Sequence, residues 1–144
     1  MAGSGSLLWY AAGLVGLFSL TPALDQAAPA PESTSTAVTA GGFTILRAPD
    51  GQFYTDVNIG AERVRMLVDP GASTVLLTPD DAARLGIEAG DGFTPVTLPT
   101  LALGPIGAAS VDAVVAPDLP VSLLGRSFLD KVSVSVDPDR MVLR

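Results

Sequence analysis

Residues 66–77 read Met-Leu-Val-Asp-Pro-Gly-Ala-Ser-Thr-Val-Leu-Leu, in which a turn with a single carboxylate separates two apolar runs. Apolar runs this short favour buried strands over helices. Pro70-Gly71 predicts a sharp reversal between them, because proline fixes φ and glycine accepts the positive φ that many turns need. Asp69 is therefore expected at the mouth of a loop, at the end of a buried strand.

Asp-Pro-Gly is also a common turn tripeptide with no chemistry attached to it. Two further features favour a functional loop. The residues Gly71, Ala72 and Ser73 are small enough for another backbone to come close. The second feature is Val121–Leu129, an apolar run that is interrupted by Gly-Arg-Ser near the C-terminus.

Together these stretches resemble the retropepsin-like aspartic proteases, and the resemblance covers about Phe53 to Leu143. That family carries its catalytic Asp in Asp-Thr-Gly-Ala-Ser, and a later apolar-apolar-Gly element packs beside that loop. The matching positions are Asp69, Gly71, Ala72 and Ser73 in the first motif, and Leu123, Leu124 and Gly125 in the second. Gly125-Arg126 is also similar to the Gly-Arg of the retroviral enzymes. The chain departs from the family at Pro70, where the family has Thr.

The resemblance implies a mostly β fold, a small closed β-barrel of the retropepsin type with one or two short helices. It implies that Asp69 is catalytic, that residues 70–73 form the active-site loop and that residues 123–126 support this loop. No cofactor and no metal are expected. Because the chain holds one Asp-x-Gly-Ala motif, the resemblance implies a homodimer in which each copy supplies one Asp69. The final strand, Arg140–Leu143, is expected in the contact between copies.

Three details of the site follow from the same resemblance. A β-hairpin flap is expected within Glu88–Pro99, with Gly90-Asp91-Gly92 at its tip. In the family, the Thr hydroxyl and backbone N–H bond across to the partner loop, and Pro70 has neither group. Arg126 is expected either to brace the loop through Ser73 or nearby backbone, or to be a surface residue.

The composition agrees with carboxylate chemistry. The 144-residue chain has no Cys and no His, which excludes disulfides, Ser-His and Cys-His pairs and the usual zinc ligand sets. Carboxylates remain as the natural acid and base. The net charge of −7 argues against a nucleic-acid partner.

The chain divides into three predicted segments. Residues 1–24 form an N-terminal hydrophobic anchor or signal segment, residues 25–41 an Ala/Pro/Ser/Thr-rich linker and residues 42–144 the folded domain. The apolar run begins at Leu7 and fades by Leu24. Its length falls between the roughly 7–15 residues of a signal-peptide core and the about 20 residues of a membrane-spanning helix. An uncleaved anchor through residues 7–24 is favoured over a cleaved signal. In a bacterium either would place the domain in the periplasm, on the exported side of the inner membrane.

Within the domain, period-two alternation predicts half-buried strands at Gln52–Ile59 and Arg63–Asp69. Thr78–Gly86 predicts a short helix, with Thr78 as N-cap, proline at the first position and Gly86 after the last turn. One helical turn is expected at residues 127–131. Further short strands are expected at residues 43–47, 101–103, 110–115, 121–124, 132–136 and 140–143. Many short strands between turns are typical of a closed β fold.

Three functions are compatible with this sequence. The first is a membrane-tethered aspartic endopeptidase that cleaves polypeptides as a homodimer. The second is a catalytically impaired pseudo-protease that serves as an exported peptide-binding or dimerisation module, which Pro70 favours. The third is a β-rich exported domain in which Asp-Pro-Gly is only a turn.

Overall fold

A computed structural model describes residues 36–39 and 42–144, so the predicted anchor and most of the predicted linker lie outside the described residues. The elements are β1 (Thr36–Thr39), β2 (Gly42–Leu46), β3 (Tyr54–Ile59), β4 (Glu62–Val68), β5 (Val75–Leu77), α1 (Pro79–Arg84), β6 (Thr94–Leu103), β7 (Ile106–Val115), β8 (Ser122–Leu124), α2 (Arg126–Leu129), β9 (Val134–Val136) and β10 (Arg140–Leu143). No helix in this described part is long and apolar enough to span a membrane.

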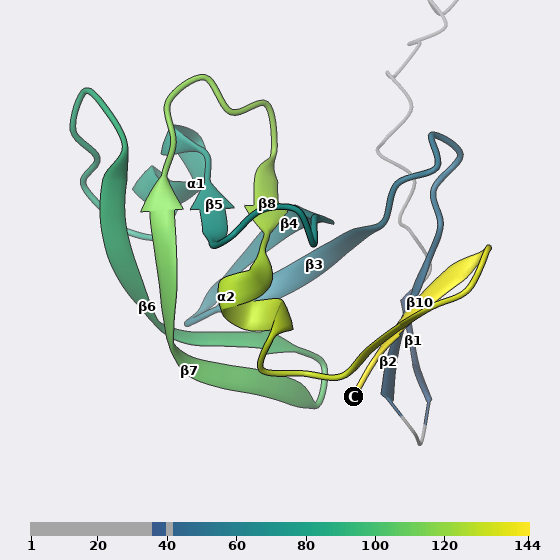
Figure 1. Cartoon of the computed structure of the whole chain (residues 1–144). Coiled ribbons are helices and arrows are strands. Elements are labelled where there is room, and N and C mark those ends of the chain that lie inside the picture. The colour runs from purple at the N-terminus through teal and green to yellow at the C-terminus, as the bar shows by residue number, and fades with distance from the viewer. Residues whose placement is uncertain (1–35, 40–41) are drawn as a thin grey trace, which may run out of the picture. The chain divides into compact units, whose positions relative to one another are not determined.

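Six strands close into a barrel in the order β3-β4-β8-β5-β7-β6 (Figure 1), and β6 returns to β3 through the pair Ile59↔Leu101. The predicted mostly β fold with a closed barrel and two short helices is confirmed. The predicted half-buried alternation of β3 and β4 is also confirmed, since Val57, Val64 and Met66 are fully buried while neighbouring residues are exposed or half-buried. Alternating apolar residues therefore fill the barrel interior, as period-two sequence patterns predict.

The strand β8 lies between the two strands that flank the Asp69 loop. Leu123 is paired with Leu67 of β4 in parallel and with Leu76 of β5 in antiparallel. Three residues from the C-terminal part of the chain thus fix the spacing of two strands far earlier in the sequence. This places Leu123 and Leu124 directly beneath the loop.

The strands β6 and β7 form one long hairpin around Gly104-Pro105 instead of the shorter separate strands that the sequence predicts. Its ladder keeps one register throughout but skips the Pro99–Ser110 position. Ser110 has a positive φ of 50° at this point. The hairpin formed by β6 and β7 bends along its length, as Figure 1 shows.

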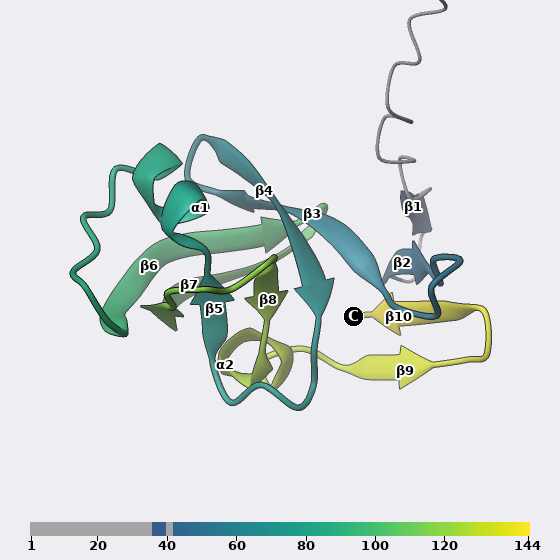
Figure 2. The same ribbon diagram turned by 90° about the horizontal axis from the view of Figure 1, so that it is seen from above.

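A second sheet has the order β1-β2-β10-β9 (Figure 2). The strand β1 lies inside the predicted linker and pairs with all of Gly42–Ile45, so residues 36–39 belong to the sheet instead. The strand β10 pairs with β2 on one side and with β9 on the other. Both edges of β10 are therefore bonded within the same chain, and the expectation that Arg140–Leu143 lies in the contact between copies stays a prediction.

The helix α1 forms as predicted. Thr78 Oγ1 accepts a hydrogen bond from the Asp81 N–H at 3.1 Å, Pro79 is the first helical residue, and Gly86 follows the last turn with φ +71°. The buried hydroxyl of Ser122 joins this helix to β8, since it accepts from the Thr78 N–H at 3.0 Å and donates to the Asp81 carboxylate. Asp81 therefore supports the fold and does not belong to the site.

Replacing Thr55 by valine is expected to stabilise the protein. Thr55 is 1% exposed in β3, and its Oγ1 finds no hydrogen-bond partner in the part of the chain that the structure describes. An unsatisfied buried polar group costs about 1–3 kcal/mol, so a side chain of the same shape without the hydroxyl should raise the free energy of unfolding by about 1 kcal/mol. Thermal unfolding of Thr55→Val measures this. Thr55→Ser, which keeps the hydroxyl and loses the methyl group, should unfold at a lower temperature than the native chain, and a lower temperature for Thr55→Val would contradict the explanation.

Candidate active site

Asp69 ends β4 at the point where the strand leaves the barrel. Its backbone N–H donates to the Leu124 carbonyl at 3.1 Å, which continues the β4–β8 ladder by one more bond. The side chain is half-buried. Among the described residues, the Gly71 N–H is the donor to the Asp69 carboxylate, at 2.8 Å to Oδ1. Oδ2 is therefore left for water, substrate or a second protein copy.

The loop after Asp69 is compact and exposed. The Ala72 N–H donates back to the Asp69 carbonyl at 3.2 Å, which closes the turn, and Pro70, Gly71 and Ser73 are exposed. Gly71 does not adopt the positive φ that the sequence suggested. The glycine leaves space there, because a Cβ would lie 3.1 Å from Asp69 Oδ1, a tight contact that the carboxylate would relieve only by shifting.

Gly125 holds this loop from below. A Cβ on Gly125 would overlap the carbonyl of Thr74 and lie 2.9 Å from the Ala72 oxygen. The next residue, Arg126, donates its backbone N–H to the same Ala72 oxygen at 2.9 Å. The junction between β8 and α2 therefore packs directly against the backbone of the Asp69 loop.

The guanidinium of Arg126 does not brace the loop. It pairs with Asp130 one turn along α2, at 3.4 Å between Nη2 and Oδ2, and both side chains are more than half exposed. A surface pair of this kind contributes little to stability. The contact of Arg126 with the loop is made by its backbone N–H alone among the described residues.

Ser127 is the supporting residue that the sequence analysis missed. Its hydroxyl accepts from the Val75 N–H at 2.9 Å and donates to the Asp112 carbonyl at 2.7 Å, and Thr74 Oγ1 donates to the same carbonyl at 2.7 Å. These bonds join the end of the loop to β7 and α2. A small hydroxyl residue directly after Gly-Arg was the only signal, and many surface serines share it.

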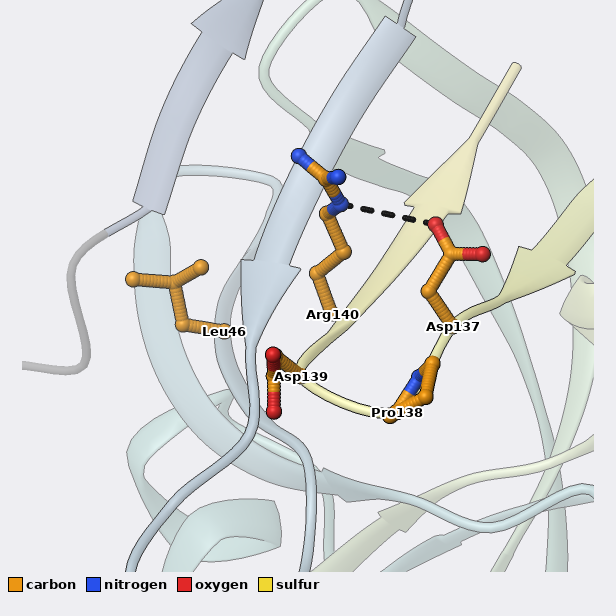
Figure 3. A pocket seen from close by; sticks show the side chains of 5 residues that line it. All are labelled: Leu46, Asp137, Pro138, Asp139 and Arg140. Carbon is orange, nitrogen blue, oxygen red and sulfur yellow. Dashed lines mark ion pairs between the residues drawn. The ribbon is translucent and has the colours of Figure 1, made fainter.

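Two hollows adjoin the loop on either side of Pro70. One has a volume of about 450 Å³ and is lined by Arg47, Gly51, Gln52, Phe53, Leu67, Val68, Asp69, Pro70, Val136 and Met141. The other, of about 390 Å³, is lined by Pro70, Arg126, Leu129, Asp130, Val132 and Val134. A third hollow at the β9–β10 turn does not include Asp69 (Figure 3), and there Arg140 Nε lies 3.4 Å from the Asp137 carboxylate.

The rim of the larger hollow is held by two groups. The guanidinium of Arg47 lies 4.5 Å from the centre of the Phe53 ring and donates to the Gly51 carbonyl at 2.7 Å. The Asp50 carboxylate accepts from the Gln52 N–H and the Tyr54 hydroxyl, and these bonds lower the pKa of Asp50 below its usual 3.8 and raise the pKa of Tyr54. A lowered pKa means that the carboxylate's stabilisation of this turn is lost only as the pH falls through that lowered value. The rim is therefore retained in mildly acid solution.

The expected flap is not formed as a hairpin. Residues 85–93 contain no strand, and Thr94 begins β6, which pairs with β7 and β3 instead of with a second arm. The Thr94 hydroxyl accepts from the Gly90 N–H at 3.1 Å and closes this glycine-rich loop on itself. Phe93 is 73% exposed at its end. The short segment lacks the alternating residues that a first arm needs.

One carboxylate is not sufficient for the attack of water on an amide by acid–base catalysis, because one group must accept a proton while another donates one. Asp-x-Gly-Ala occurs once in the sequence. The geometry thus offers half of a two-carboxylate site, on a loop that is exposed and anchored from below.

The chain is similar to proteins of known family. Residues 55–131 match the family model described as gag-polyprotein putative aspartyl protease. A crystal structure of a retropepsin-like aspartic protease from Rickettsia conorii superposes with a TM-score of 0.66 and 30% sequence identity, over 76% of this chain and 93% of that chain.

Two curated proteins described as uncharacterized are also similar. One, from Sinorhizobium sp., is 32% identical over 101 residues, which are 59% of this chain and 43% of that protein. The other, from Rickettsia prowazekii, is 27% identical over 118 residues, which are 72% of this chain and 51% of that protein. The chain therefore spans about half the length of the curated relatives that it matches.

Proposed function

Because the chain belongs to the retropepsin-like aspartic protease family, we propose that it is an endopeptidase that hydrolyses polypeptides as a homodimer. Asp69 of one copy faces Asp69 of a second copy, with a water between them. The observation that carries this proposal is the Asp69 loop itself: a half-buried carboxylate with a free Oδ2, held by Leu124, Gly125 and Arg126.

The chemistry follows from two carboxyl groups at close range. Two like charges about 3 Å apart cannot both ionise, so the pair holds one proton and offers an acid and a base together. The ionised Asp69 takes a proton from water as the water oxygen attacks the peptide carbonyl. The other Asp69 protonates the carbonyl oxygen, which gives a geminal diol. The amine then leaves with the proton that the first Asp69 took from water, while a diol hydroxyl returns a proton to the second Asp69. Both carboxyl groups return to their starting state.

Proteolysis of a peptide library by the full-length chain at mildly acid pH tests this function. We expect cleavage of internal bonds that is blocked by a peptide in which a hydroxyethylene group replaces the scissile amide, because such a mimic of the tetrahedral intermediate binds tighter than substrate. Chelators should leave the rate unchanged. A complete lack of cleavage over a range of pH and protein concentration would contradict the proposal.

Pro70→Thr is expected to raise the cleavage rate. Pro70 removes both a backbone N–H and a hydroxyl from each loop, so the two loops lack hydrogen bonds worth about 0.5–1.5 kcal/mol each. The larger effect is on geometry, since misplacing reacting groups by about 1 Å can cost on the order of a hundredfold in rate. Steady-state cleavage rates and the dimer dissociation constant measure the gain. No gain in either would mean that other contacts already hold the loops in register.

The second candidate function is a pseudo-protease, an exported module that binds peptides or dimerises without cleaving. Pro70 and the absence of a hairpin flap in residues 85–93 favour it. This module would bind the hydroxyethylene peptide and the unmodified peptide with similar affinity, and would leave the second intact.

We further propose that residues 7–24 tether the domain to the inner membrane of a bacterium, on the periplasmic side. The support is the apolar, uncharged composition of this segment and the Ala/Pro/Ser/Thr-rich stretch that follows it. Without added protease, the chain should be recovered in the membrane fraction. Protease added to spheroplasts should degrade its domain. Recovery of the intact chain in the cytoplasmic fraction would contradict this location.

A further inference from the structure

The proposed function needs two copies that meet at Asp69, and the structure limits which surface can join them. The C-terminal strand β10 has no free edge, since β2 and β9 occupy both sides. Within residues 36–39 and 42–144, the strand β9 pairs with β10 alone and ends the sheet. An exposed sheet edge is a template for pairing with another chain unless charges, proline or a covering segment protect it.

The free edge of β9 presents the backbone groups of its two valines. Ser133 exchanges two hydrogen bonds with Arg144, at 2.8 and 2.9 Å, and the Asp137 N–H donates to the Arg140 carbonyl at 2.8 Å. Residues of an antiparallel pair alternate between hydrogen-bonded and non-bonded positions. Residues 133, 135 and 137 therefore point their backbone groups toward β10. The N–H and C=O groups of Val134 and Val136 point outward.

The valine side chains are apolar and unusually exposed. Val134 is 38% and Val136 54% exposed, and both lie on one face of the sheet because they are two residues apart. Val136 lines the hollow that contains Asp69 and Pro70, and Val134 lines the hollow on the other side of Pro70. The valines and Pro70 therefore form one exposed apolar patch beside the catalytic loop.

The free edge and the loop also lie on the same side of the domain. Seen from above, the outer edge of β9 and the tip of the β4–β5 loop both face the lower side of the view, and α2 lies beside the loop (Figure 2). A second copy placed against β9 is thus next to Asp69. The nearby Asp137 carboxylate is paired with Arg140, which neutralises that charge beside the edge.

We infer that two copies of the chain join through the free edges of β9, antiparallel, about a two-fold axis at Ser135. Val134 of each copy then exchanges backbone hydrogen bonds with Val136 of the other, and the two four-stranded sheets become one continuous sheet. The axis is perpendicular to this sheet, so both valine pairs and both Asp69 loops lie on the same face. This joint, the β9–β9 contact between the two copies, specifies how the proposed dimer forms, and the inference rests on that proposed function.

The same register brings the two Ser135 residues opposite each other as a non-bonded pair, with Cα atoms about 4.5 Å apart. That distance is within the range that a disulfide bridges. The two Ser133 residues are four strand positions apart along the joint, about 13 Å, which a disulfide cannot bridge. Both serines are exposed and the chain has no native Cys, so they form a matched pair for cross-linking.

The test is mild oxidation of full-length Ser135→Cys and Ser133→Cys at low concentration, followed by mass measurement with and without reductant. We expect Ser135→Cys to convert to a reducible covalent dimer at least tenfold faster than Ser133→Cys. Equal rates, or no dimer from Ser135→Cys, would overturn the joint.

Cleavage by the linked dimer separates this proposal from the proposed function. If the native chain cleaves peptides, linked Ser135→Cys should remain active at dilutions that inactivate the native chain, and loss of activity on linking would overturn the joint. If the native chain cleaves nothing, the protease function fails, and the relative rates of cross-linking still decide whether β9 joins two copies.

Discussion

Asp69→Asn is expected to abolish peptide cleavage while leaving the fold intact. Asparagine has the shape of aspartate, and its Oδ1 can still accept the 2.8 Å hydrogen bond from the Gly71 N–H that holds the loop. It cannot take a proton from water, and the loss of acid–base catalysis costs about 10²–10⁴-fold in rate. The two measurements are the cleavage rate and the melting temperature, of which only the first should change.

Asp118→Asn is the matched control for this loss. Asp118 is an exposed carboxylate with a positive φ of 60°, a conformation that asparagine also tolerates. It should cleave like the native chain. If Asp69→Asn kept half or more of the native rate, another group would have to activate the water.

Gly125→Ala is expected to remove both stability and cleavage. The added methyl group would overlap the Thr74 carbonyl, and the Ala72 oxygen lies 2.9 Å from it. The loop cannot move away, because the Arg126 N–H is bonded to the same Ala72 oxygen. Overpacking costs about 1–3 kcal/mol or more, which is a large part of the total stability of about 5–15 kcal/mol for a domain. We expect a melting temperature lower by several degrees, and no cleavage by the protein that remains folded.

Gly107→Ala is the control for Gly125→Ala. A Cβ at Gly107 would make ordinary contacts, 3.6 Å from the Leu101 oxygen and 3.7 Å from the Ala102 Cβ, and its φ is not positive. Its effect should be within about 0.5 kcal/mol. Equal melting temperatures for the two variants would show that Gly125 does not support the loop by close approach.

Local patterns predicted much of the barrel. The alternation of β3 and β4 and the capping of α1 by Thr78 are each determined by neighbouring residues, and the structure confirms them. The position of Asp69 at the end of β4 follows from the same local signals. The placement of Gly125 under the loop came from the family resemblance, because nothing local relates residue 125 to residue 74.

What the sequence did not predict depends on pairing between distant segments. The role of Ser127 requires Val75 and Asp112 to lie beside it, and no periodic pattern in the sequence indicates that these three residues are neighbours. The enclosure of β10 depends on β2, nearly a hundred residues earlier. The prediction of a flap hairpin failed for a related reason. Thr94 belongs to β6, and the length of β6 is set by its pairing with β7.

The central claim is that each active site contains Asp69 from two copies, and mixing the native chain with Asp69→Asn tests it most directly. At constant total concentration, with exchange of subunits allowed, only native–native pairs should cleave. An equal mixture should then keep about a quarter of the activity of the all-native sample, because random pairing leaves about one dimer in four fully native. A fall to about one half, in proportion to the native chain present, would mean that each copy carries a complete site and would contradict the claim.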